Sequence, residues 1–281
     1  MKILLTGANG QLGRCFQDRL PAEWEILATD SNELDITDLE RVAEVVKSFQ
    51  PDAIVNAAAY TTVDKAESEP EIAKSINVHG PQNLAIVATK YNVRLVHVST
   101  DYVFDGSATE PYNEDSATNP LSVYGNTKLA GEQAVTKISP EAIIVRTAWV
   151  FSEYGNNFVK TMLRLAKERD SLSIVNDQRG CPTYAGDLAQ AIISLLEKNV
   201  DGGVYHYCGD KEVSWYEFAE GIFKVASKKN AISCIPTLAA ISGEEYPTPA
   251  KRPKYSVLSC LKINSLNIHQ SNWLKRINDM I

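Results

Sequence analysis

Short apolar runs alternate with amphipathic segments through the first half of the chain. The segments between the runs carry apolar residues every three or four positions, as in Leu12, Phe16 and Leu20, which is the spacing of one helix face. Near-continuous apolar strands separated by helices are typical of a parallel sheet that is covered on both faces. The pattern therefore predicts an α/β fold with a doubly wound parallel sheet. The predicted strands lie at 3–5, 25–30, 53–59, 94–100 and 142–147.

A glycine-rich turn joins the first apolar run to the first amphipathic segment. Its glycines are Gly7, Gly10 and Gly13. Glycine allows a positive φ and a close approach of the backbone to a pyrophosphate, and the N-terminus of the following helix offers free N–H groups to it. The turn predicts a Rossmann-like dinucleotide site. A purely structural turn is the alternative.

Two further features of the first half fit such a site. Asp30 ends the second run, where a carboxylate can accept hydrogen bonds from the adenosine ribose; it can equally be a turn or cap residue. The third run ends in the small residues Ala57, Ala58 and Ala59, which leave room for a ligand at a strand end.

Thr37 and Glu40 predict a capping box for the helix that lies between the second and third runs.

Tyr124 and Lys128 lie four positions apart in a segment of helical character. Residues at this spacing share one face of a helix. A lysine ammonium one turn from a phenol favours the phenolate, so we expect Lys128 to lower the pKa of Tyr124 and to prepare it for proton transfer. The pair alone also fits a solvated helix face.

The second half lacks the regular alternation of the first. It predicts helices over 157–169, 187–198 and 214–228, with Asp187 as one N-cap and Ser214 with Glu217 as a capping box. A proline-rich stretch follows, and a last short helix surrounds Trp273. We expect residues 1–150 to form the dinucleotide-binding domain, with some return of the chain around 182–204. Residues 151–281 then form mainly a smaller, mixed substrate-binding lobe.

Charge and cysteine content restrict the partners. The net charge is −7 and no block of Lys or Arg occurs, which gives no electrostatic case for nucleic acid or an anionic membrane. The five cysteines are widely spaced and odd in number, as expected for free thiols in a reducing cytoplasm rather than for a zinc site. The apolar runs are too short for a signal peptide or a membrane span. We expect a cytoplasmic protein.

The glycine spacing, Asp30, a strand that ends in Thr100, and the Tyr124/Lys128 pair follow one another in an order that resembles the extended short-chain dehydrogenase/reductase family. Within it, several strings are similar to those of the dTDP-4-dehydrorhamnose reductases, and the resemblance covers essentially the whole chain. It implies reduction of dTDP-4-dehydro-β-L-rhamnose to dTDP-β-L-rhamnose by NADPH or NADH, the last step of dTDP-rhamnose biosynthesis. The strings are Ser99–Gly106, Arg146–Phe151, Gly155–Met162, Asp177-Gln178, Pro182-Thr183 and Arg252–Ser256.

The resemblance also implies roles for individual residues. Thr100, Tyr124 and Lys128 are the catalytic residues. Thr100, Asp101 and Trp149 contact the sugar nucleotide, although Trp149 also fits plain core packing. The cofactor-binding residues are Gly7, Gly10, Gln11, Leu12 and Gly13 at the phosphates, Asp30, Asp35 and Ile36 at the adenosine end, and Ala57, Ala58, Ala59, Tyr60, Tyr102, Tyr124 and Lys128 farther along.

One position departs from the family. Some relatives carry an acidic residue on the first helix that helps bind Mg²⁺ at a dimer contact, with a second acidic position that Asp187 matches; here the first position is Cys15. Because Mg²⁺ prefers oxygen ligands, we expect no metal site and a monomer or homodimer without a metal bridge. Two other functions stay open: reduction of a different NDP-4-keto-6-deoxy sugar, or a non-catalytic dinucleotide-binding regulatory subunit. The intact Thr100, Tyr124 and Lys128 favour an enzyme.

Overall fold

A six-stranded parallel sheet forms the centre of the protein, seen in a computed structural model that describes residues 1–281. The strand order is β10-β5-β4-β3-β1-β2, and the register pairs Thr6 with Asn56 and Thr100 with Thr147, so the carboxyl ends of these strands meet at one edge. The predicted parallel sheet is confirmed. Its strands are β1 (Lys2–Thr6), β2 (Glu25–Thr29), β3 (Ala53–Asn56), β4 (Arg94–Thr100), β5 (Ile143–Thr147) and β10 (Gly203–His206).

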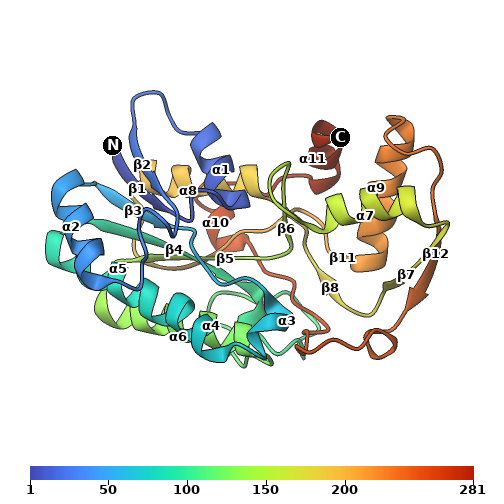
Figure 1. The fold of residues 1–281 in the computed structure, drawn as a ribbon, viewed down its shortest axis with the longest axis horizontal. Coiled ribbons are helices and arrows are strands. Elements are labelled where there is room, and N and C mark those ends of the chain that lie inside the picture. Colours follow the sequence, from blue (N-terminus) through green and yellow to red (C-terminus); the bar gives the residue numbers. More distant parts are fainter.

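Helices cover both faces of this sheet (Figure 1). Successive side chains of a strand point to opposite faces, so Ile3 and Leu5 pack into the core on one side and Leu4 into the core on the other. Because both faces are covered, the middle of β1 is apolar at successive positions. One layer contains α1 (Gln11–Asp18) and α8 (Ala185–Glu197), and the other contains α2 (Leu39–Phe49), α5 (Gly80–Tyr91) and α6 (Val123–Ile138).

A smaller lobe lies beside the carboxyl edge of the sheet, on the right of Figure 1. It has its own core, which is centred on Phe218, Ile222 and Phe223. Its helices are α7 (Phe158–Glu168), α9 (Trp215–Lys228) and α11 (Trp273–Met280). Three two-stranded pairs complete it: β6 (Val150–Phe151) with β9 (Thr183–Tyr184), β8 (Arg179–Gly180) with β11 (Val213–Ser214), and β7 (Ser171–Val175) with β12 (Thr237–Ile241).

The predicted capping box Ser214/Glu217 is confirmed, whereas two other predicted caps are wrong. The N-cap of α2 is Asp38, which accepts from the Arg41 amide at 3.0 Å, while the Thr37 hydroxyl donates to Asp35 at 2.8 Å. Helix α8 begins two residues before Asp187, whose carboxylate is held by side chains from far along the chain. A local cap pattern is therefore overridden by a neighbouring acceptor in one case and by a tertiary ion pair in the other.

The segment before α5 is more helical than the sequence indicated. The sequence alone indicates two separate helices here, at about 71–78 and 81–91. In the structure a π-helical turn at Ser75–His79 joins them, so α4 (Pro70–Lys74) continues into α5 without a break. The short helices α3 (Val63–Ala66) and α10 (Leu261–Asn264) were not predicted. No helix of the protein is both long enough and apolar enough to cross a membrane.

Candidate active site

A cleft of about 1210 Å³ opens at the carboxyl edge of the sheet and extends to the smaller lobe. Residues from both halves of the chain line it, including the glycine-rich turn, Asp30, Lys128 and Trp149. Ligands of doubly wound sheets bind at this edge because the strand ends and helix N-termini converge there. The cleft therefore brings together nearly all the residues that the sequence predicted for the site.

The glycine-rich turn has a geometry that only glycine tolerates. Gly7 has a φ of +71°, and a Cβ there would lie 2.6 Å from the Ala58 amide nitrogen. A Cβ on Gly13 would lie 2.3 Å from the Gly7 carbonyl oxygen. The turn thus packs directly on the end of β3 and presents the N-terminus of α1 to the cleft. A cradle of this kind fits a dinucleotide pyrophosphate.

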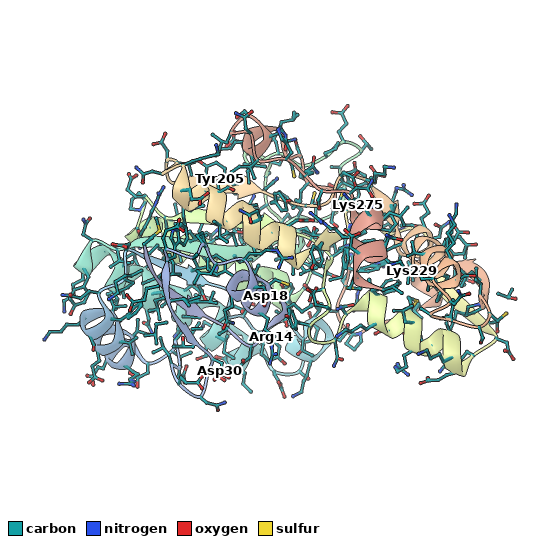
Figure 2. The ribbon with its side chains drawn as sticks, turned by 90° about the horizontal axis from the view of Figure 1, so that it is seen from above. Arg14, Asp18, Asp30, Tyr205, Lys229 and Lys275 are labelled. Atoms are coloured by element: carbon teal, nitrogen blue, oxygen red, sulfur yellow. The ribbon has the colours of Figure 1, made fainter.

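Asp30 lies at the far end of the cleft, next to the glycine-rich turn. Its carboxylate accepts from the Asn32 amide at 2.8 Å and from the Asn9 side chain. Arg14 donates from Nε to the Asn9 carbonyl at 3.3 Å, so Asn9 lies between the two charged groups, which Figure 2 shows on the same side of the molecule. Asp35 and Ile36 also line this end, and the predicted adenosine residues are therefore adjacent in space.

Tyr124 projects into the cleft from the first turn of α6. Ser122 caps this helix by accepting from the Gly125 amide at 3.2 Å, which fixes the direction of the first turn. Burial raises the pKa of the Tyr124 phenol to about 12, while a hydrogen bond with the Thr100 hydroxyl acts in the opposite direction. The phenol therefore keeps its proton at neutral pH.

Lys128 lies one turn farther along α6 and is also buried. Its ammonium donates to the Val98 carbonyl at 2.7 Å. Burial lowers the pKa of Lys128 to about 8, and the charge of Glu132 raises it. The prediction that Lys128 holds the pKa of Tyr124 below its ordinary value is wrong in this structure, because the loss of solvation around the phenol dominates.

Thr100 ends β4 and Asp101 follows it, beside the phenol. The Thr100 hydroxyl donates to Asp101 Oδ1 at 3.1 Å and accepts from the Tyr102 amide at 3.2 Å. Burial raises the pKa of Asp101 to about 6, and the nearby Ser256 and Thr100 hydroxyls act in the opposite direction. The Tyr102 ring meets the Tyr124 ring edge-on, with centroids 5.5 Å apart. These contacts hold the predicted catalytic and substrate residues in one cluster.

Trp149 both lines the cleft and packs against other aromatic residues, so the two interpretations of this residue are not exclusive. Its ring stacks on Trp215 with centroids 3.5 Å apart. Sequence patterns did not single out Trp215, because its helix lies in the other lobe. Tyr60 is the predicted residue that does not line the cleft; its hydroxyl donates to Glu69 at 2.8 Å.

A second contact that sequence reasoning missed ties the glycine-rich turn to the smaller lobe. The side-chain oxygen of Gln11 accepts from Ser152 at 3.0 Å and from Asn157 at 2.9 Å. Asn157 is also the N-cap of α7, where it accepts from the Lys160 amide. More than a hundred residues separate Gln11 from these partners, so no local pattern marks the contact.

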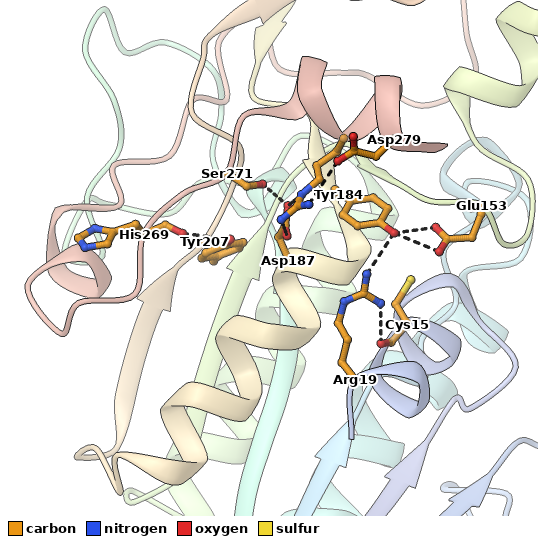
Figure 3. Close-up of polar contacts among 10 residues, drawn as sticks. Cys15, Arg19, Glu153, Tyr184, Asp187, Tyr207, His269, Ser271 and Asp279 are labelled. Carbon is orange, nitrogen blue, oxygen red and sulfur yellow. Dashed lines mark hydrogen bonds and ion pairs between the residues drawn. The ribbon is translucent and has the colours of Figure 1, made fainter. Parts of the chain in front are cut away.

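The positions that match the family's metal ligands do not form an oxygen-rich site here (Figure 3). Burial raises the pKa of the Cys15 thiol to about 12. Asp187 is paired with the Arg276 guanidinium at 2.8 and 2.7 Å and also accepts from Ser271. No group of three or more His, Cys, Asp or Glu side chains is arranged to hold a metal ion. These residues therefore do not fit Mg²⁺.

Comparison with known proteins agrees with this site. The family model described as RmlD substrate binding domain matches residues 1–281. A dTDP-4-dehydrorhamnose reductase from Aggregatibacter actinomycetemcomitans is 47% identical and covers 99% of this chain and 98% of its own, and that of Escherichia coli K12 is 44% identical over 93% and 90%. A crystal structure of the reductase from Bacillus anthracis in complex with NADP has a TM-score of 0.93 at 40% identity, over 99% and 98%. This chain belongs to the dTDP-4-dehydrorhamnose reductase family.

Proposed function

We propose that this protein reduces the C4 keto group of dTDP-4-dehydro-β-L-rhamnose to the hydroxyl of dTDP-β-L-rhamnose, the last step of dTDP-rhamnose biosynthesis. NADPH or NADH binds in the glycine-rich cradle and supplies the hydride. The observation that carries the proposal is the meeting of Thr100, Tyr124 and Lys128 in one cleft with that cradle. Full-length similarity to reductases of this name supports the choice of substrate.

Tyr124 supplies the proton in this proposal. The phenol holds its proton at neutral pH because burial raises its pKa to about 12. As negative charge develops on the substrate oxygen, the basicity of that oxygen rises above that of the phenolate and the proton moves to it. The Thr100 hydroxyl lies beside the phenol and donates to Asp101 Oδ1. In this proposal it turns its proton from Asp101 to the substrate oxygen and stabilises the developing charge.

Lys128 stabilises the phenolate that remains on Tyr124. The ammonium is buried and fixed by the Val98 carbonyl, so its charge acts through a medium of low polarity. The Tyr102 amide, which donates to the Thr100 hydroxyl oxygen, holds Thr100 in place during this step. The chain thus provides an acid, a hydrogen-bond donor and a fixed cation within one cluster.

We also propose that the two halves of the chain bind different ligands. Residues 1–150, with the return of the chain around 182–204, bind the dinucleotide, and residues 151–281 mainly hold the substrate. Gln11, which contacts both Ser152 and Asn157, lies where the two meet. We propose a monomer or homodimer that acts in the cytoplasm, where the free thiols of all five cysteines are stable.

The test is a direct assay of the purified protein. Reduced nicotinamide absorbance is followed with dTDP-4-dehydro-β-L-rhamnose and then with a panel of other NDP-4-keto-6-deoxy sugars. We expect turnover with both NADPH and NADH and the highest kcat/KM with the rhamnose precursor. A higher kcat/KM with another keto sugar would assign that sugar as substrate. Cofactor binding without turnover on any sugar would identify a regulatory subunit instead.

A further inference from the structure

Two indole rings from different lobes face each other inside the cleft. Trp149 follows β5 of the central sheet, and Trp215 is the first residue of α9 in the smaller lobe. Their centroids are 3.5 Å apart and their planes differ by 6°. Both rings are only partly buried and both line the cleft. The pair therefore presents flat apolar surface to any ligand that occupies this end of the cleft.

The backbone around the pair is specialised. Trp149 has a φ of +47°. Residues other than Gly, Asn or Asp seldom adopt this left-handed backbone conformation. Its ring lies so close to Gly180 that a Cβ there would approach within 2.6 Å. Strain of this kind persists where the surrounding structure holds it and is concentrated at ligand sites. The position of the Trp149 ring thus depends on both an unfavourable conformation and a missing side chain.

The near-parallel stack of Trp149 on Trp215 is a weak contact, so the two rings can move apart to admit a ligand. Aromatic rings prefer offset or edge-to-face contacts to a near-parallel, fully overlapping stack, because the electron-rich faces repel each other. Trp215 also has a second aromatic neighbour in its own lobe, Phe158, with centroids 4.7 Å apart. A planar ring with carbonyl groups, which is electron-poor, stacks on an indole more favourably than a second indole does.

The other aromatic residues of the cleft are already engaged at the reacting end. Tyr102 and Tyr124 contact each other beside Thr100, where the keto group must lie. A nucleotide sugar is long, and its base lies at the opposite end from the reacting carbon. Of the aromatic residues that line the cleft, Trp149 and Trp215 are those left for the base.

We propose that Trp215 is the stacking residue for the pyrimidine base of the substrate nucleotide, which enters between Trp215 and Trp149. This inference rests on the proposed function, because it assumes a pyrimidine nucleotide sugar. Trp215 belongs to the smaller lobe, so base binding also gives that lobe a direct part in substrate selection. Loss of one base–aromatic stack weakens binding roughly five- to hundredfold.

The experiment measures binding of dTDP, inorganic pyrophosphate and NADPH by calorimetry to the wild type and to Trp215→Ala. We expect dTDP to bind roughly five- to hundredfold more weakly to Trp215→Ala, in the range of a lost stack. Pyrophosphate, which has no base, and NADPH are expected to bind as they do to the wild type. Equal dTDP affinity in the two proteins would overturn the proposal, and so would a loss of pyrophosphate affinity as large as that of dTDP.

Two further variants separate stacking from folding. Tyr216→Ala removes the next aromatic residue of the same helix, which lines a different surface groove; we expect wild-type dTDP affinity. Trp215→Phe keeps an aromatic face and is expected to bind dTDP more tightly than Trp215→Ala; equal binding by the two would contradict stacking. Turnover of the wild type is measured separately, so a failed assay refutes the proposed function while unchanged dTDP binding refutes only this inference.

Discussion

Tyr124 is the residue whose hydroxyl the proposed reaction needs most. We expect Tyr124→Phe to lower kcat by about 10²–10⁴-fold, the usual contribution of a positioned general acid. NADPH affinity should stay close to that of the wild type, because the ring that packs against Tyr102 remains. The measurements are steady-state kinetics and NADPH titration. Activity within tenfold of the wild type would show that another group donates the proton.

Lys128 should set the upper pH limit of the reaction. Its pKa is lowered to about 8 by burial, so the ammonium loses its proton as the pH rises through that value, whereas Tyr124, at about 12, is still protonated. We expect kcat/KM to fall above about pH 8. In Lys128→Arg the cation does not titrate, so the fall should disappear from the pH profile of any remaining activity. A fall that persists would belong to another group.

Asp30 bears on the choice between NADH and NADPH. A carboxylate favours the free 2′-hydroxyl of NADH and repels the 2′-phosphate of NADPH, and at an exposed site this repulsion is screened to about 1 kcal/mol. Arg14 donates to the Asn9 carbonyl, and the Asn9 side chain donates to Asp30. The positive charge of Arg14 can therefore offset the repulsion of the 2′-phosphate by Asp30. We expect both cofactors to work within about thirtyfold of each other.

The two charges can be tested separately through kcat/KM for each cofactor. Asp30→Ala should shift the preference several-fold toward NADPH, and Arg14→Ala should shift it toward NADH. The two variants serve as controls for each other, since a general loss of cofactor binding would lower both values together. An unchanged ratio in Asp30→Ala would leave Asp30 as a turn residue only.

At the scale of the element, the N-terminus of α9 places Trp215 at the cleft. Ser214 accepts from the Glu217 amide at 3.1 Å and donates to Asn176 at 2.6 Å. Ser214→Ala should lower the free energy of unfolding by about 1 kcal/mol, as loss of an N-cap does. Urea denaturation measures this. Ser242→Ala, in the capping box of an exposed 3₁₀ turn, is the matched control and should have a smaller effect.

Elements with a strong local pattern were predicted well. The first five strands of the central sheet, α6 with its Tyr124/Lys128 face and the capping box of α9 all follow from local periodicity and cap residues. The sixth strand, β10, comes from the second half of the chain, and its place at the sheet edge was not predicted. Helix α3 has only four residues and therefore no periodicity to detect. The glycine-rich turn was recognisable because a backbone that needs glycine can be identified from the residue type alone.

The properties that were missed or wrong depend on what surrounds a residue. No residue near Asp187 in the sequence indicates that its carboxylate forms an ion pair with Arg276. Likewise, no residue near Trp149 indicates that its ring stacks on Trp215. The pKa of Tyr124 was misjudged because the spacing to Lys128 is visible in the sequence but the burial of the phenol is not. Distant contacts and solvation, rather than element boundaries, set the limit of prediction for this site.

At the scale of the whole molecule, the Asp187–Arg276 pair joins α8 of the sheet layer to α11 of the smaller lobe (Figure 3). Because a fixed guanidinium already neutralises Asp187, we expect removal of divalent cations with a chelator to change neither kcat nor the molar mass in light scattering. A protein treated with buffer alone and one resupplied with Mg²⁺ are the controls. A chelator-dependent loss of mass that Mg²⁺ restores would reveal a metal site built from other carboxylates.

The strand order of the central sheet has a consequence for the protein during its synthesis. The edge strand β10 begins at Gly203 and pairs with β5, which ends at Thr147. At about 5–20 residues per second, the ribosome takes several seconds to make the chain between them. During that time β5 is an open, strongly apolar edge, and such edges pair readily with other chains. The nascent protein is therefore expected to expose an edge that can pair with other chains until β10 emerges and covers it.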